Sequence, residues 1–215
     1  MTNAFEQMNA MYRYQRYFYN ITRKYYLLGR DQLIAQMNIR AGENILEVGC
    51  GTGRNLIILA KKYPHTNFFG LDASSAMLKT AQDKIDAQNL KNIVLKTGLA
   101  DDFNYQKNFN LDKPFDGIFF SYSISMIAAW KESIAVVLAN LTRGGKFYIV
   151  DFYDQKDLPA WFRHVLKNWL KKFHVQFWNG LLPHLAGLET QGLGKLKITP
   201  VARRYAFITE FEKII

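Results

Sequence analysis

The segment Ile45-Leu-Glu-Val-Gly-Cys-Gly-Thr-Gly53 joins a short apolar run to a glycine-rich turn. A short apolar run that ends in glycines is typical of a buried strand. Glycines at 49, 51 and 53 allow a tight turn and a close approach of the backbone to a ligand. The dinucleotide fingerprint G-x-G-x-x-G would need glycine at position 54, where this chain has Arg54. The segment therefore predicts a strand followed by a ligand-binding turn that differs from the dinucleotide-binding turn.

Two carboxylates accompany this turn. Glu47 lies inside the apolar run, where a carboxylate is costly unless it meets a polar partner. A cationic amino group is such a partner, whereas the pyrophosphate of a dinucleotide would be repelled. Asp72 ends the second expected strand, and a carboxylate there can accept both hydroxyls of a ribose. Asp72 by itself does not distinguish S-adenosylmethionine (AdoMet) from NAD, whereas Glu47 together with the glycine turn favours AdoMet.

Strands and helices alternate along most of the chain. We expect strands at 44–48, 67–71, 92–96, 117–120 and 147–150, and helices at 55–63, from Ser74 or Ser75 to about 88, and at 132–141. This alternation predicts a parallel sheet with helices on both faces. The last two strands, 195–199 and 205–212, have only a short connection, so they must be antiparallel. The prediction is an α/β fold, a Rossmann-like three-layer sandwich with a seven-stranded, mostly parallel sheet and a C-terminal antiparallel hairpin.

Length and composition indicate one globular domain with a small addition. The chain has 215 residues, of which 49% are hydrophobic and 21% charged. We assign residues 1–43 to an N-terminal helical lid and residues 44–215 to the main domain. No apolar run approaches the roughly 20 residues that span a bilayer, and the first 20 residues lack the apolar stretch of a signal peptide. The single cysteine, Cys50, excludes an internal disulfide and suits the cytoplasm.

The positive charge is concentrated in one part of the chain. The net charge is +10, and residues 156–204 contain nine lysines or arginines against the two acids Asp157 and Glu189. Such a localised positive field attracts an anionic polymer or an anionic bilayer surface.

The glycine turn with Glu47 and Asp72 resembles the first motif and the acidic second-strand end of the class I AdoMet-dependent methyltransferases. The resemblance implies AdoMet as methyl donor and S-adenosylhomocysteine as product. In that family an acid after the third strand often binds the adenine amino group, but Leu99 stands at that position here. Asp101, Asp102 or backbone groups take this role instead. The residues that we assign to the cofactor are Glu47, Gly49, Cys50, Gly51, Gly53, Asp72, Ala73, Met77, Ala100, Asp101 and Ser121.

The end of the fourth strand supplies the candidate catalytic residues, Ser121 and Tyr122. Class I enzymes place the reacting methyl group near this strand end. Tyr122 would orient an amine, or hold a methylammonium by cation–π attraction worth about 0.5–2 kcal/mol; alternatively, its ring only packs under a loop. We find no cluster of histidines, cysteines or acids with metal-binding spacing, so no metal is expected.

Four outer segments resemble a narrower group, the bacterial N-methyltransferases of betaine-lipid synthesis. The segments are Thr22-Arg-Lys-Tyr-Tyr-Leu-Leu-Gly-Arg-Asp31, Ser121-Tyr-Ser-Ile-Ser-Met-Ile127, residues 150–163 and residues 169–175. The resemblance covers about residues 12–175. It implies trimethylation of the amine of diacylglyceryl-homoserine to give diacylglyceryl-trimethylhomoserine. Alternatives are a quinone-type or amino-acid methyltransferase and, with less support, an RNA methyltransferase.

Two segments rich in basic and aromatic residues are candidates for contact with the ligands or with a membrane. Arg23, Tyr26 and Arg30 of the lid are candidates for the AdoMet carboxylate or the substrate, or belong to a solvated helix. The expected helix 158–173 carries an apolar stripe with cations between. The stripe either covers the sheet, which we favour, or lies in a bilayer interface. We therefore expect a glycerolipid substrate, peripheral contact with an anionic membrane surface, no nucleic acid, and a place in the cytoplasm at the inner face of the membrane. The oligomeric state stays open.

Overall fold

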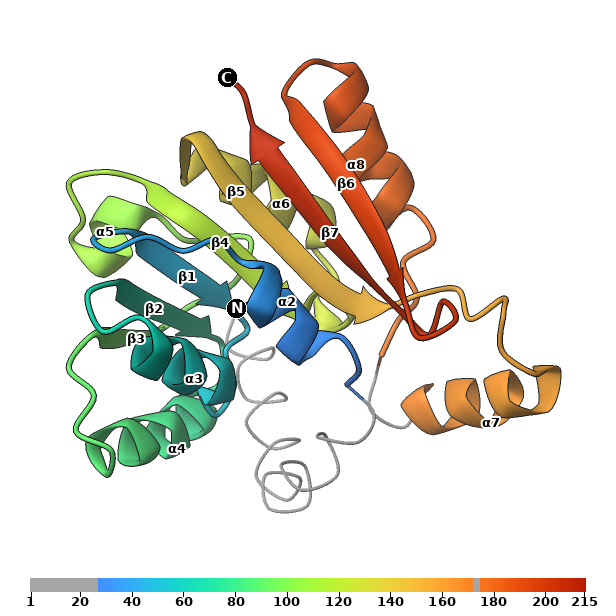
Figure 1. Cartoon of the computed structure of the whole chain (residues 1–215), viewed down its shortest axis with the longest axis horizontal. Coiled ribbons are helices and arrows are strands. Elements are labelled where there is room, and N and C mark those ends of the chain that lie inside the picture. The colour runs from blue at the N-terminus through green and yellow to red at the C-terminus, as the bar shows by residue number, and fades with distance from the viewer. Residues whose placement is uncertain (1–26, 172–174) are drawn as a thin grey trace.

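A seven-stranded sheet forms the centre of the computed structural model, which describes residues 27–171 and 175–215 (Figure 1). The strand order is β3-β2-β1-β4-β5-β7-β6. The strands are β1 (Asn44–Val48), β2 (Asn67–Asp72), β3 (Ile93–Thr97), β4 (Phe115–Ser121), β5 (Leu141–Phe152), β6 (Gly194–Val201) and β7 (Ala206–Lys213). Strands β1 to β5 are parallel, whereas β7 pairs antiparallel with both β5 and β6. The predicted mostly parallel sheet with its C-terminal hairpin is confirmed.

Helices cover both faces of the sheet and create two apolar cores (Figure 1). One core joins the sheet to α2 (Arg30–Gln36), α3 (Arg54–Lys62) and α4 (Ser75–Asp86). The other joins it to α5 (Tyr105–Phe109), α6 (Trp130–Ala139) and α8 (Leu181–Thr190). β1 is buried over its whole length because it lies in the interior of the sheet, between β2 and β4. This arrangement is the predicted three-layer sandwich.

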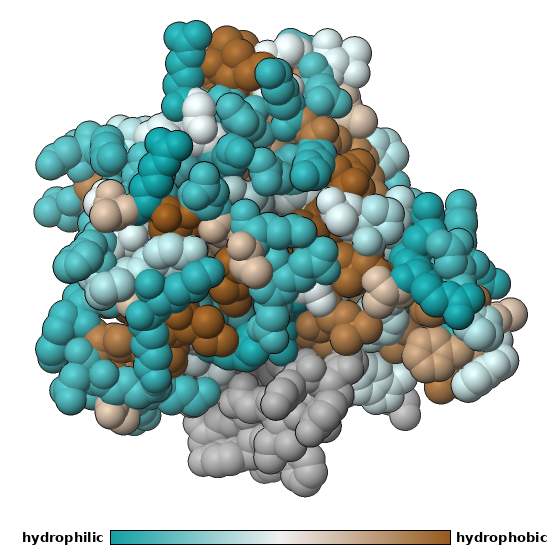
Figure 2. Space-filling model, in the orientation of Figure 1, coloured by the Kyte–Doolittle hydropathy of each residue, from teal (hydrophilic) through white to brown (hydrophobic). Residues whose placement is uncertain are grey.

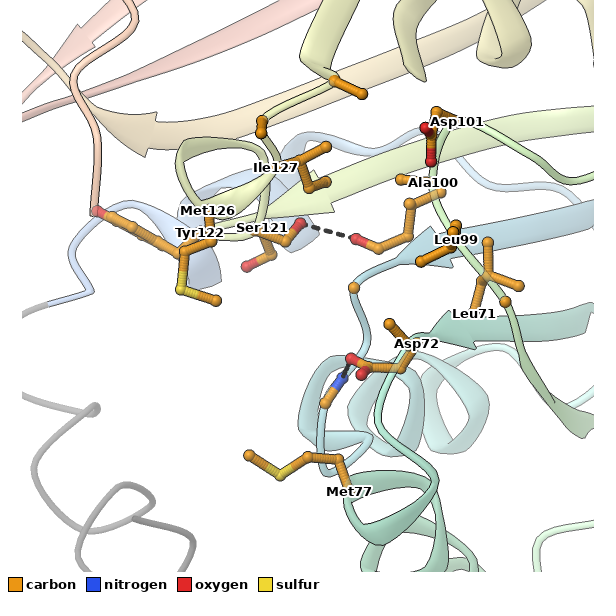
Figure 3. A pocket seen from close by; sticks show the side chains of 18 residues that line it. Leu71, Asp72, Met77, Leu99, Ala100, Asp101, Ser121, Tyr122, Met126 and Ile127 are labelled. Carbon is orange, nitrogen blue, oxygen red and sulfur yellow. Dashed lines mark hydrogen bonds between the residues drawn. The ribbon is translucent and has the colours of Figure 1, made fainter. Parts of the chain in front are cut away.

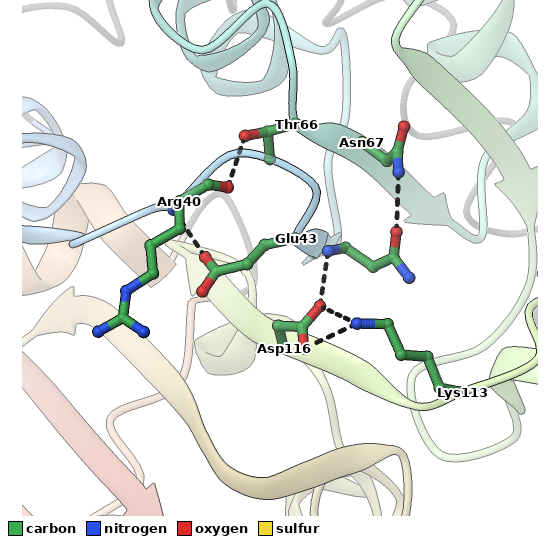
Figure 4. Close-up of polar contacts among 7 residues, drawn as sticks. Arg40, Glu43, Thr66, Asn67, Lys113 and Asp116 are labelled. Atoms are coloured by element: carbon green, nitrogen blue, oxygen red, sulfur yellow. Dashed lines mark hydrogen bonds and ion pairs between the residues drawn. The ribbon is translucent and has the colours of Figure 1, made fainter.

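The amino ends of β1, β2 and β4 are joined by polar contacts (Figure 4). Asp116 accepts the backbone N–H of Asn44 at 2.9 Å, and Lys113 lies 3.3 Å from the same carboxylate oxygen. The side chain of Asn67 donates to the side chain of Asn44 at 3.1 Å. These bonds satisfy polar groups at the amino edge of the sheet, where the strands begin.

The sequence predictions differ from the structure at several places. The predicted helix 132–141 ends earlier, because Asn140 is the C-cap of α6 and β5 already begins at Leu141. The predicted helix 158–173 corresponds to α7 (Ala160–Lys171), which lies beyond the end of β5 and projects from the body of the molecule (Figure 1). The helix that covers the β6 end of the sheet is α8, which the sequence analysis missed. The expectation that the stripe belongs to the core holds for Leu166 and Leu170, which are buried, whereas Trp161 and Val165 are exposed.

Only part of the predicted N-terminal lid lies within the described residues. α2 begins at Arg30, and its Leu33 and Ile34 are buried in the core formed with α3 and α4. The assignment of residues 1–43 to a lid stays a prediction, since residues 1–26 lie outside the described part. None of the described helices is long and apolar enough to cross a membrane.

Candidate functional site

A cavity of about 360 Å³ lies at the carboxyl ends of β1, β2 and β4 (Figure 3). Ligands in open α/β sheets bind at this edge, where neighbouring strands connect in opposite directions. Three stretches enclose the cavity: the glycine turn with the end of β2, the loop after β3, and the segment after β4. The lining residues are Val48, Gly49, Gly51, Leu71, Asp72, Ala73, Met77, Gly98, Leu99, Ala100, Asp101, Ser121, Tyr122, Ser123, Met126, Ile127, Ala128 and Ala129.

The glycine turn between β1 and α3 needs glycine at position 49. Gly49 has a φ of +74°, and a Cβ added there would lie 2.4 Å from the Cβ of Ser123. The turn also uses its own N–H groups, because those of Gly49 and Cys50 donate to the carbonyl of Leu71 at 2.7 and 3.1 Å. Gly51 donates to the carboxylate of Asp72 at 2.7 Å. These N–H groups are therefore not free to bind a pyrophosphate, in agreement with the prediction against a dinucleotide.

Asp72 is held at the mouth of the turn. One of its carboxylate oxygens accepts the N–H of Gly51, and the other accepts the N–H of Ser74 at 2.8 Å. Ser74 is the N-cap of α4, as predicted, and accepts from the N–H of Met77 at 3.3 Å. The fixed carboxylate lines the cavity and can accept hydroxyl groups of a ribose.

Glu47 lies behind the turn rather than on the cavity wall. Its side chain faces α3, where one carboxylate oxygen accepts from the Asn55 side chain at 2.7 Å. The other oxygen is buried and has no hydrogen-bond partner. Burial raises the pKa of Glu47 to about 8, although the bond from Asn55 and the charge of Arg30 lower it. The unsatisfied oxygen fits a cationic ligand group, because buried polar atoms normally have a partner.

The loop after β3 forms the side of the cavity where adenine is expected. Leu99, Ala100 and Asp101 line this side, and Leu99 and Asp102 form an isolated bridge. Asp101 therefore borders the cavity, whereas Asp102 does not. The apolar surface of Leu99 and of Leu71 suits a flat heterocycle, which leaves Asp101 and backbone groups as its polar partners.

The segment after β4 supplies the opposite wall, and much of it was missed by the sequence analysis. Met126 is the last residue of the short helix η1 (Ile124–Met126), and Ile127 follows it. Both line the cavity. Asp151 at the end of β5 holds η1 by accepting the N–H of Ser125 at 3.0 Å. Burial raises the pKa of Asp151 to about 6. The only sequence signal for this wall was the apolar stretch after the serines.

Ser121 and Tyr122 both line the cavity but offer different groups. The Oγ of Ser121 is buried without a hydrogen-bond partner, so it is available to a ligand. The hydroxyl of Tyr122 donates to the carbonyl of Leu28, and Figure 3 shows it pointing away from Asp72. Burial raises the pKa of Tyr122 well above its usual range, so this phenol stays protonated. Its ring contacts Phe152 edge-on, which matches the predicted packing role.

The remaining predicted site residues divide into three groups. Ala73 and Met77 line the cavity. Cys50 and Gly53 belong to the turn without lining the cavity, and the Cys50 thiol is buried beside Gly70. Arg30 is buried at the start of α2, close enough to Glu47 to affect its pKa. Arg23 and Tyr26 lie outside the described residues. Within the described part, no group of three histidines, cysteines or acids is arranged to hold a metal.

The residues at this edge fit AdoMet on the geometry alone. Asp72 lines the cavity and matches the ribose, and glycine at position 49 avoids the contact with Ser123 that a Cβ would make. Behind the turn, outside the cavity wall, the buried Glu47 oxygen without a partner matches a cationic group. Apolar residues of the β3 and β4 sides complete the wall.

Comparison with known proteins agrees with this geometry. A family model described as a methyltransferase domain matches residues 39–203. The chain is 28% identical over 122 residues to a demethylmenaquinone methyltransferase of Symbiobacterium thermophilum, covering 56% of this chain and 47% of the relative. It is 30% identical over 144 residues to a carboxy-S-adenosyl-L-methionine synthase of Campylobacter hominis, covering 65% of this chain and 58% of the relative. The chain thus spans about half the length of these two curated relatives.

Solved structures show the same fold. The crystal structure of the YcgJ protein of Bacillus subtilis superimposes with a TM-score of 0.67 and 15% sequence identity. The match covers 87% of this chain and 98% of that protein.

Proposed function

The chain belongs to the methyltransferase-domain family, whose members use AdoMet as methyl donor, and on this premise we propose that it methylates a small amphiphilic molecule. The observation that carries the proposal is the composition of the cavity wall. The described residues that line the cavity include no lysine or arginine, and Met126 and Ile127 make the wall after β4 apolar. A nucleic-acid acceptor would need cations beside the site, whereas an apolar wall with few polar groups suits a small molecule.

Each side of the cavity has a role in positioning. When bound, AdoMet supplies a methyl group that its sulfonium sulfur already activates. Asp72 would accept the ribose hydroxyls, and the unpaired oxygen of Glu47, behind the turn, would attract the amino group. Leu71 and Leu99 provide apolar contact for the adenine ring. Methyl transfer then depends mainly on alignment of the acceptor with the methyl group.

Ser121 and Tyr122 act on the acceptor in this proposal. The unpartnered Oγ of Ser121 hydrogen-bonds the polar end of the acceptor. Tyr122 keeps its proton and its bond to Leu28, so it presents a ring face and does not act as a base. An aromatic face next to the reacting atom suits a group that becomes cationic on methylation.

Two acceptor chemistries fit this description. The curated relatives named demethylmenaquinone methyltransferase favour a quinone-type acceptor, which has a polar ring and an apolar tail. The second candidate is the amine of diacylglyceryl-homoserine, favoured by the resemblance of the outer segments such as 121–127 and 150–163 to enzymes of betaine-lipid synthesis. The two differ in the atom that receives the methyl group, carbon in the first and nitrogen in the second.

A direct assay distinguishes the candidates. The purified chain is incubated with AdoMet and, in parallel, with a demethylmenaquinol, with synthetic diacylglyceryl-homoserine and with transfer RNA, and the products are analysed by mass spectrometry. We expect one added methyl group on the quinol, or up to three on the lipid amine, and none on the RNA. Methylation of RNA without methylation of either amphiphile would overturn the proposal.

The matched control variants are Asp72→Ala and Asp116→Ala. Both carboxylates accept a backbone N–H, that of Gly51 and that of Asn44. Only Asp72 lines the cavity. We expect Asp72→Ala to weaken AdoMet binding at least about tenfold, and Asp116→Ala to leave the affinity unchanged, both measured by calorimetry. Equal effects of the two variants would remove Asp72 from the ribose site.

A further inference from the structure

The apolar face of α7 is only partly covered by the rest of the protein. At about 100° per residue, Trp161 and Val165 lie on one flank of this face and Leu166 and Leu170 on the other. Leu166 and Leu170 are buried in the core shared with α2 and α3 and attach the helix. Trp161 and Val165 are 70% and 59% exposed. The helix is therefore anchored by one flank and presents the other flank to solvent.

The sequence of α7 and of the segments beside it is rich in cations. α7 contains three lysines or arginines and no acid. The segment that leads into α7 carries Lys156, whose side chain is 73% exposed and lies 3.8 Å from Asp154, and an adjoining turn carries the exposed Arg203. Gln155 donates its backbone N–H to the carbonyl of Arg204 at 3.0 Å, which holds that turn beside the start of α7. Figure 2 shows tan and brown residues beside teal ones where α7 projects.

We propose that the exposed flank of α7, formed by Trp161 and Val165, docks onto an anionic bilayer surface. The aromatic side chain of tryptophan prefers the headgroup region of a membrane. Basic residues next to an apolar helix face add attraction to anionic lipids. The exposed patch of two apolar side chains is small for a stable protein–protein interface, which needs about 800 Å² on each partner. A bilayer needs no complementary shape, so a small apolar flank with cations beside it is sufficient.

The geometry favours a helix that lies in the plane of the membrane. α7 has 12 residues, which rise about 18 Å, less than the roughly 30 Å of a bilayer core. It follows β5 beyond the carboxyl edge of the sheet, the same edge that holds the cavity (Figure 1). Docking through α7 brings this edge close to the membrane, where an amphiphilic acceptor resides. The inference itself is independent of the acceptor, because vesicle binding requires neither acceptor nor AdoMet.

Vesicle binding tests the inference. The full chain is sedimented with vesicles of phosphatidylcholine alone and with vesicles that contain phosphatidylglycerol. We expect binding to the anionic vesicles that weakens with added salt, and little binding to the neutral ones. The double variant Trp161→Ser/Val165→Ser should bind the anionic vesicles at least about tenfold more weakly. Val94→Ser is the matched control, since Val94 is also exposed, at 42%, but lies on β3.

A second measurement places the contact on α7. Vesicles that contain brominated lipids quench the fluorescence of tryptophans that enter the interface. We expect quenching in the wild-type chain and in Trp130→Phe, and loss of most of it in Trp161→Phe. Unchanged quenching in Trp161→Phe, equal binding of neutral and anionic vesicles, or wild-type binding by the double variant would each overturn the inference. So would a wild-type dimer that the double variant converts to a monomer, because the flank would then be covered by a second copy.

Discussion

The carboxyl group of Glu47 keeps its proton at neutral pH, because burial raises its pKa from 4.5 to about 8. The surrounding charges are Arg30 and Arg54, which lower the pKa, and Asp72, which raises it. The folded protein therefore holds a proton between about pH 4.5 and 8 that the unfolded chain has released. Its free energy of unfolding falls as the pH rises through this window, by up to about 1.4 kcal/mol per pH unit from this group. Below the window the group has no such effect.

Proton release on AdoMet binding tests the role of Glu47. An ammonium group against the unpaired oxygen would favour the ionised carboxylate, so binding at pH 7 should release close to one proton. Calorimetry in buffers of different ionisation enthalpy measures this number. We expect no release in Glu47→Gln, which keeps the acceptor for Asn55, and unchanged release in the control Glu43→Gln at the amino end of β1. Equal buffer dependence in wild type and Glu47→Gln would separate Glu47 from the ligand.

Alanine substitutions at Gly49 and Gly42 distinguish the effect of backbone strain on stability from the effect of disturbing the binding site. Both have positive φ, +74° and +80°, but a Cβ at Gly49 meets Ser123 at 2.4 Å, whereas a Cβ at Gly42 has nothing within 4 Å. Gly42→Ala should cost about 1 kcal/mol of stability from strain alone. Gly49→Ala should cost about 2–4 kcal/mol and weaken AdoMet binding more than tenfold. Urea denaturation and calorimetry measure the two effects, and similar losses in both variants would contradict the close contact.

At the level of elements, Asn140 holds the loop that carries the adenine side of the cavity. Its side chain accepts the N–H of Tyr105 at 2.8 Å and donates to the carbonyls of Phe103 and Val136 at 3.1 and 2.8 Å. One buried amide therefore joins the end of α6, the start of α5 and the loop after Leu99.

Replacing Asn140 tests this connection. Asn140→Ala leaves the N–H of Tyr105 and the carbonyl of Phe103 without this partner, whereas the carbonyl of Val136 keeps the backbone N–H of residue 140. We expect a loss of about 2–4 kcal/mol in the free energy of unfolding. AdoMet affinity should fall as well, because the loop after β3 loses its support. Asn108→Ala is the control, since Asn108 accepts a single N–H, that of Asn104. A loss of under about 1 kcal/mol for Asn140→Ala in urea denaturation would argue against the role of the amide.

At the level of the whole molecule, the cofactor site joins parts of both faces of the sheet. Its turn precedes α3 on one face, while η1 and the loop before α5 lead to helices on the other. A ligand that binds only the folded chain stabilises it by about 2.7 kcal/mol at 100 times its dissociation constant.

Thermal unfolding measures this stabilisation. For a chain of 215 residues, it corresponds to an increase in Tm of about 5–10 °C. We expect this increase with AdoMet at 100 times its dissociation constant and no increase with NAD at the same concentration. Stabilisation by NAD but not by AdoMet would overturn the conclusion, drawn from Glu47 and the occupied N–H groups of the glycine turn, that the site binds AdoMet.

Local patterns predicted the strands, the glycine turn, the Ser74 cap and the place of Asp72, because each depends on neighbours within one or two turns of chain. The antiparallel hairpin followed from a short connection. The family could be predicted for the same reason, since its motif is contiguous.

Contacts between distant segments were beyond such patterns. The hydroxyl of Tyr122 binds the carbonyl of Leu28, 94 residues away, and Asp151 positions η1 from another strand. The apolar stripe of α7 gave no sign of which flank is buried, because periodicity specifies one face of a helix but not what covers it. The partner of each buried group depends on how the sheet and its helices pack together, and that packing involves the whole chain at once.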